Sequence, residues 1–174
     1  MSLSFMNAEN KNHLSLIIWI VALIAIGGVI GSFTKPEITT WYSTLNRSTL
    51  TPPNYVFPIA WTILYGIIGA CGWLIWREPS FRKLSVIKTL YMTQLILNWS
   101  WTPLFFHCHL TGLSLVVLVA MDILVCVLVC LAYPKIRAVS LLMLPYLFWI
   151  LFASYLNFYI WRYNWMKISN GGQA

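Results

Sequence analysis

Five long apolar stretches constrain the fold of this chain more than any other feature of its sequence. They occupy residues 14–33, 56–76, 84–106, 110–133 and 139–161. A helix needs about 20 predominantly apolar residues to cross the hydrocarbon core of a bilayer, and each stretch has that length. Strands of a membrane β-barrel would instead alternate polar and apolar residues over about ten positions, which these stretches do not. The sequence therefore predicts an all-α integral membrane bundle of five transmembrane helices.

The composition supports a membrane protein and argues against a soluble fold. Sixty per cent of the 174 residues are hydrophobic and 9% are charged, whereas an ordinary soluble domain carries about 25% charged residues. The net charge of +7 arises from cations that lie between the apolar stretches, as membrane-flanking residues do. We therefore expect the lipid bilayer, and no nucleic acid, as a partner.

The connections between the stretches predict one domain and its orientation. We expect a single membrane domain at residues 14–165, with short tails at 1–13 and 166–174. The connection at 34–55 is long and the others are short, which is typical of a lid or binding loop. Cations are more numerous on the side of the N-terminus (Lys11, Arg77, Arg82, Lys83, Lys88, Lys135 and Arg137) than on the other side (Lys35, Arg47, Arg162 and Lys167). The positive-inside rule then places the N-terminus in the cytoplasm and the long loop outside.

One carboxylate lies inside a predicted span. Asp122 is near the middle of the fourth stretch, where an ionised side chain costs roughly 2.5–3.5 kcal/mol on insertion scales. A protonated Asp122 that hydrogen-bonds a neighbouring helix is one interpretation. A functional role, such as driving a secondary transporter, is another, although a proton relay would need further groups of this kind.

Polar and aromatic residues share one face of the third stretch. Their spacing of three and four residues aligns Tyr91, Gln94, Asn98, Trp101 and Phe105 on a helix. Such a face is expected to contact other helices or a cavity rather than lipid. Hydrogen bonding between helices, worth about 0.6 kcal/mol per bond, and a pocket wall with polar groups for a ligand both remain open.

The fifth stretch contains two patterns. Trp149, Ala153 and Leu156 lie on one face, and the small Ala153 indicates either close helix packing or a notch for a ligand ring. Leu156, Tyr159 and Arg162 fit a short pattern proposed for cholesterol contact. Any interfacial Tyr followed by an Arg can satisfy that pattern.

Motifs for metal binding or nucleophilic catalysis are weak. His107 and His109 flank Cys108 and could ligate a metal in a turn, but side chains two residues apart do not face each other on a helix. We therefore predict no metal site. The sequence also lacks a P-loop, a dinucleotide-binding motif and a Ser/His/Asp set in a plausible order.

Taken together, the motifs resemble those of the TspO/MBR family of tryptophan-rich sensory proteins and translocator proteins. Four segments carry the resemblance in order: GGVIGSFT followed by WYSTL at residues 27–45, FPIAWTILYGIIG at 57–69, QLILNWSWTPLFF at 94–106, and LPYLFWILFASYLNFYIWRYN at 144–164. The resemblance covers all five predicted spans.

The resemblance implies a pocket between the helices, under the first loop as a lid. It implies binding of tetrapyrroles, protoporphyrin IX or haem, as ligands rather than required cofactors, for sensing or transport, with sterols as further ligands. The implied ligand-binding residues are Asn98, Trp101, Trp149, Ala153 and Leu156, and the implied sterol motif is Leu156, Tyr159 and Arg162. It also suggests a homodimer and, because the spans are helical, the bacterial inner membrane.

The first loop departs from the family pattern. The segment WYSTLNRSTLTPP at 41–53 has Ser48 where the family has Pro and Leu50 where it has Trp. In some bacterial members of the family, that Trp and the Trp that corresponds to Trp149 are linked to light-driven tetrapyrrole breakdown. An enzyme that degrades porphyrin with light and oxygen, using Trp149, is therefore the alternative function.

Overall fold

The chain folds into helices joined by short connections. The computed structural model describes the backbone of residues 3–169 and the side chains of residues 12–165, and its elements in this range are all helical. The α-helices are α1 (Leu3–Ser32), α2 (Lys35–Thr39), α3 (Val56–Arg77), α4 (Leu84–Thr102), α5 (Thr111–Ala132) and α6 (Arg137–Ser169). A 3-10 helix, η1 (Tyr42–Thr44), lies in the first loop, and a π-helix, η2 (Pro103–His107), follows α4.

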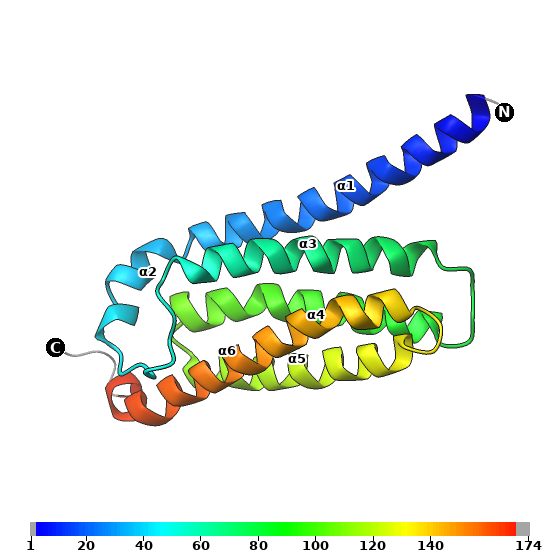
Figure 1. Cartoon of the computed structure of the whole chain (residues 1–174). Coiled ribbons are helices and arrows are strands. Elements are labelled where there is room, and N and C mark those ends of the chain that lie inside the picture. The colour runs from blue at the N-terminus through cyan, green and yellow to red at the C-terminus, as the bar shows by residue number, and fades with distance from the viewer. Residues whose placement is uncertain (1–2, 170–174) are drawn as a thin grey trace.

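The long helices lie side by side (Figure 1). Helices α3, α4, α5 and α6 form the body of the bundle, and α1 packs along α3 with its N-terminal half projecting away. The first loop, residues 33–55, and the connection between α4 and α5 are at one end of the bundle. The connections α3–α4 and α5–α6 are at the other end. This arrangement places the first loop over the end of the bundle where α6 finishes.

The all-α prediction is confirmed, and four helices are long and apolar enough to cross a membrane. These are the segments Asn12–Ser32, Val56–Arg77, Thr111–Ala132 and Arg137–Trp165. The third predicted span is less apolar than these four segments, because α4 carries Lys88, Gln94 and Asn98 among its 19 residues. Of the five transmembrane helices that the sequence predicts, four therefore have the length and apolar character needed to cross a membrane.

Two helix boundaries differ from the predicted ones. The backbone of residues 3–13, which we predicted as a tail, continues α1, since this segment contains neither Gly nor Pro to end a helix. The predicted span 84–106 changes from α-helix to π-helix at Pro103, because proline lacks an N–H for the helical ladder. The N–H of Cys108 donates to the Pro103 carbonyl at 2.9 Å. The backbone of α6 continues to Ser169, so the first part of the predicted C-terminal tail (166–174) is helical, and residues 170–174 lie outside the described residues.

The interior and the outer surface of the bundle are both apolar. Ile68, Ile87, Met121 and Ile150 are fully buried where α3, α4, α5 and α6 meet. Large side chains that are more than half exposed cover the outside of the long helices, among them Ile18, Val29, Ile63, Val116 and Phe148. An apolar surface of this extent needs lipid around it.

Helix α1 packs closely against α3 because α3 has glycine at the crossing. A Cβ atom on Gly69 would lie 2.9 Å from the Cα of Ile20 and 3.1 Å from the carbonyl oxygen of Trp19. Both neighbours belong to the backbone of α1, so neither can rotate away. At Gly66, one turn earlier, a Cβ atom would meet nothing within 4 Å.

We expect Gly69→Ala to destabilise the bundle by about 1–3 kcal/mol, because overpacking forces the backbones of α1 and α3 apart. The matched control is Gly66→Ala, which should leave stability unchanged or raise it by up to about 1 kcal/mol, since alanine is the better helix former. Thermal unfolding of the two variants in detergent tests this. Equal midpoints would contradict the close α1–α3 contact.

Candidate functional site

A cavity of about 560 Å³ lies between the helices at the first-loop end of the bundle. We refer to it as the inner cavity. Its walls come from α1, α3, α4 and α6, and residues of the first loop and of α2 line one end. The walls are mostly apolar and rich in aromatic rings, which include Tyr42, Phe57, Trp61, Tyr65, Trp101 and Phe105.

Four of the five residues predicted to bind ligand line the inner cavity. Asn98 and Trp101 come from α4, and Ala153 and Leu156 come from α6. Ala153 presents a single methyl group on the cavity wall, so α6 leaves space at this level. Helical spacing predicted that the residues of each helix share a face, and the family resemblance implied that the two faces line one pocket, as these four residues do. Their role in binding a ligand stays a prediction.

Trp149 is the predicted residue that does not line the inner cavity. Its ring packs edge to face against Phe57, with centroids 6.1 Å apart, and against Trp61, with centroids 6.4 Å apart. Both of these rings are part of the cavity wall. Trp149 thus supports the wall from behind, one turn of α6 further from the first loop than Ala153.

A chain of buried hydrogen bonds crosses the bundle at the base of the cavity. The Tyr65 hydroxyl donates to Asn98 Oδ1 at 2.6 Å, Asn98 Nδ2 donates to the Tyr146 hydroxyl at 3.1 Å, and that hydroxyl donates to Gln94 Oε1 at 2.8 Å. The chain connects α3, α4 and α6. Asn98 therefore has both functions left open by the sequence, an interhelical bond and a place on the cavity wall, whereas Gln94 makes only the bond.

The Trp101 ring is held by a second asparagine. Its Nε1–H donates to Asn157 Oδ1 at 3.1 Å, and Asn157 Nδ2 donates to the Thr111 carbonyl at 2.7 Å. The Trp101 ring also stacks on Phe105, with centroids 5.2 Å apart. These contacts fix a flat aromatic surface on the cavity wall.

The first loop is attached to the connection between α4 and α5. His109 Nε2 lies 3.2 Å from Glu37 Oε2, and the His109 ring stacks on Trp41 with centroids 4.0 Å apart. His109 adopts a positive φ of 55°, so the backbone turns sharply at this point. No group of three His, Cys, Asp or Glu residues that could hold a metal occurs in the described part of the chain.

Tyr42 anchors the same loop, and it also lines the inner cavity. Its ring packs against Phe105 and Phe106. Burial raises the pKa of the Tyr42 hydroxyl above its ordinary value, and the nearby Arg47 guanidinium partly opposes this rise. Tyr42 is therefore neutral at physiological pH and contributes an apolar surface.

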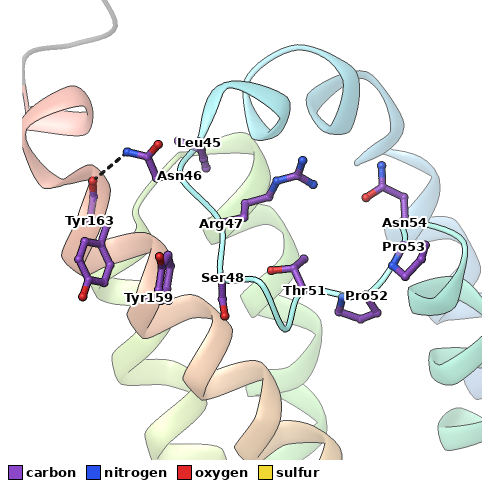
Figure 2. A pocket seen from close by; sticks show the side chains of 10 residues that line it. All are labelled: Leu45, Asn46, Arg47, Ser48, Thr51, Pro52, Pro53, Asn54, Tyr159 and Tyr163. Carbon is purple, nitrogen blue, oxygen red and sulfur yellow. Dashed lines mark hydrogen bonds between the residues drawn. The ribbon is translucent and has the colours of Figure 1, made fainter.

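The predicted sterol motif is divided between two faces of α6. Leu156 is buried and lines the inner cavity. Tyr159 instead lines a separate open pocket of about 770 Å³ between the first loop and the end of α6, shown in Figure 2. We refer to it as the outer pocket. Arg162 is exposed, with its guanidinium carbon 5.9 Å from the centroid of the Tyr163 ring.

Asp122 lies outside both pockets. Its Oδ2 accepts a hydrogen bond from Ser154 Oγ at 2.7 Å, which joins α5 to α6. Its Oδ1 is buried without a hydrogen-bond partner among the described residues. The hydrogen bond to a neighbouring helix that we considered for Asp122 is therefore present.

Helix α3 provides a part of the cavity wall that we did not predict from the sequence. Phe57, Trp61 and Tyr65 line it together. Their spacing of four residues, which aligns side chains on a helix, was a usable signal. The first-loop residue Tyr42 gave no comparable signal, because its place depends on the tertiary fold of the loop.

Loss of the Asn98 amide should destabilise the protein. Asn98→Ala leaves the Tyr65 hydroxyl without its acceptor, and we expect a loss of about 1–3 kcal/mol. Ser100→Ala is a control on the same helix, because Ser100 Oγ donates only to the Leu97 carbonyl of its own turn. Chemical or thermal unfolding in detergent compares the two, and an equal effect would exclude a special role for the buried chain.

The contact between Glu37 and His109 should restrain the first loop. Glu37→Gln removes the carboxylate from this partly exposed contact, and a contact of this kind is worth roughly 0.2–1 kcal/mol. We expect backbone amides of residues 35–45 to exchange hydrogen up to about fivefold faster, measured by mass spectrometry. Glu78→Gln, at the opposite end of the bundle, should leave that exchange unchanged. Unaltered exchange in Glu37→Gln would mean that other contacts hold the loop.

Comparison with known proteins assigns the family. The chain matches the TspO/MBR family over residues 19–162. It is 42% identical over 153 residues to the tryptophan-rich protein TspO of Archaeoglobus fulgidus, which covers 88% of this chain and 99% of that protein. It is 33% identical over 150 residues to the translocator protein of Bos taurus, with 84% and 89% of the two chains covered. The protein is thus an integral membrane protein that belongs to the TspO/MBR family.

Proposed function

We propose that the protein binds a tetrapyrrole, such as protoporphyrin IX or haem, in the inner cavity, for sensing or for transport. The observation that carries the proposal is the cavity itself, with its aromatic walls and its few polar groups. Its volume of about 560 Å³ lies within the roughly 300–1,000 Å³ that is usual for small-molecule sites. The relatives named as tryptophan-rich and translocator proteins support a role of this general kind.

The chemistry of the cavity suits a flat amphipathic ligand. The Trp101 and Phe105 rings offer a stacking surface for a macrocycle. The methyl group of Ala153 leaves room beside it. Lys35 also lines the cavity at the first-loop end and would pair with a carboxylate of the ligand.

In this proposal α4 is a fifth transmembrane helix and the first loop is a lid. The polar residues that lower the hydropathy of α4, such as Gln94 and Asn98, are buried within the bundle. They therefore add little cost to crossing the bilayer. The Glu37 and Trp41 contacts with His109 would keep the lid closed. The charge distribution favours a cytoplasmic N-terminus, and we propose the bacterial inner membrane as the location and a homodimer as the assembly.

Sterols are a second ligand class for this proposal. Leu156 lines the inner cavity, but Tyr159 and Arg162 are directed elsewhere. A sterol that used the whole motif would have to lie on the outer face of α6. The inner cavity is therefore the better-supported place for an apolar ring system.

Titration of the purified protein with protoporphyrin IX tests the main proposal. Saturable quenching of tryptophan fluorescence is expected for the unmodified protein. Ala153→Phe should weaken binding at least tenfold, because the new ring fills the cavity. The control is Ala138→Phe, the same change at an exposed position near the start of the same helix, which should bind as the unmodified protein does. Unchanged affinity in Ala153→Phe would remove the inner cavity as the binding site.

The enzymatic alternative depends on Trp149. Its ring contacts Trp61, which lines the cavity, so Trp149 would act through another aromatic ring rather than by touching the ligand. Illumination of the porphyrin complex in air, followed by absorption spectroscopy, tests this. A new product band that is lost in Trp149→Phe would favour the enzyme, and a stable spectrum would favour a binding protein.

A further inference from the structure

The outer pocket is a second concave site, separate from the inner cavity. It lies between residues 45–54 of the first loop and the last turns of α6, and Asn54 is the one residue that lines both spaces in the described chain. We propose that it binds the phosphate head group of an anionic membrane lipid. The proposal rests on its charge, its free hydrogen-bond donors and its position, and does not depend on tetrapyrrole binding.

The charge of the pocket comes from one arginine. Arg47 is the charged residue in its lining, and it forms no ion pair with a carboxylate within the described residues. Its guanidinium carbon lies 5.2 Å from the centroid of the Tyr42 ring. Figure 2 shows the side chain extending from the loop in the direction of Asn54. Glu37, the carboxylate of the first loop, is paired with His109, so it does not neutralise Arg47.

The pocket also holds hydrogen-bond donors that the protein does not use. Asn46 and Ser48 are engaged, since Asn46 Nδ2 donates to the Tyr163 carbonyl and Ser48 Oγ bonds the Tyr155 hydroxyl. Four other polar side chains of the lining make no hydrogen bond to the described residues: Thr51, Asn54, Tyr159 and Tyr163. The pocket thus combines a guanidinium with free polar side chains and has no acid among the described residues of its lining. Guanidinium and hydroxyl or amide donors are groups that bind phosphate oxygens.

The position of the pocket selects a lipid as the source of the phosphate. Tyr159 and Tyr163 lie near the end of the apolar segment Arg137–Trp165, where aromatic residues mark the level of the head groups. Exposed apolar or aromatic side chains continue from Tyr159 along the same face of α6 into the bundle's outer surface: Tyr155, Leu151 and Phe148. Acyl chains would lie on this stripe while the head group occupies the pocket.

Lipid titration of the full-length protein in neutral detergent, without porphyrin, tests the proposal. Phosphatidylglycerol and phosphatidylcholine with identical acyl chains are compared by native mass spectrometry and thermal shift. We expect the unmodified protein to retain phosphatidylglycerol preferentially. Arg47→Gln should weaken that binding about tenfold, the size expected for a charge-assisted contact. Arg162→Gln is the matched control, because it removes a cation from the same end of the bundle but outside the pocket. This variant should keep the preference for phosphatidylglycerol.

The other outcomes overturn the proposal. Preserved lipid preference in Arg47→Gln would exclude the pocket, and equal loss in both variants would indicate only general attraction of anionic lipid to cations. Inorganic phosphate that binds as tightly as phosphatidylglycerol would indicate a site for a soluble anion instead. If Arg47→Gln does not fold, Arg47→Lys keeps the charge and Tyr159→Phe with Tyr163→Phe removes two donors. Arg47→Lys should retain the preference for phosphatidylglycerol, and the double Tyr→Phe variant should weaken it. Loss of the preference in Arg47→Lys with an unchanged preference in the double variant would reject the site.

Discussion

The hydrogen bonds of Asn98 are the interaction on which the arrangement of the bundle depends. In a membrane the hydrophobic effect does not draw helices together, so close packing and polar contacts must do so. Asn98 accepts from Tyr65 of α3 and donates to Tyr146 of α6, and thereby places α4 between these helices. Gln94 and Asn98 are both buried, and the side-chain oxygens of both amides accept hydrogen bonds inside the protein. The same residue forms part of the wall of the inner cavity.

Glycines extend this arrangement to α1. A Cβ atom on Gly27 would overlap the ring of Tyr65, so glycine at this position allows Tyr65 to lie against α1 while its hydroxyl reaches Asn98. Gly69 allows the backbone of α1 to approach α3 in the same way. Cavity shape and helix packing therefore share the same small residues. In this protein a change in the packing of α1 is also a change in the cavity wall.

The sequence predicted the long helices and which residues of α4 and of α6 share a face, because both follow from the pattern of side chains along a helix. Spacing aligned Asn98 with Trp101 and Ala153 with Leu156, and the family resemblance implied that both pairs line one pocket, as they do. Trp149 has the same spacing but lies behind the wall, since the cavity extends over only part of the face of α6 and spacing cannot show where along a helix a cavity ends. The pairing of Glu37 with His109 could not be predicted either, as 72 residues separate them and the loop conformation decides it.

The two pockets share the first loop, and this connects them physically. Tyr42 lines the inner cavity, and the guanidinium of Arg47, which lines the outer pocket, lies over the Tyr42 ring. An anion in the outer pocket would bind the same guanidinium that contacts the Tyr42 ring. If lipid in the outer pocket changes the affinity of the inner cavity for its ligand by some factor, that ligand must change the affinity for lipid by the same factor. The surrounding membrane would then influence ligand binding through the first loop, whose residues line both pockets.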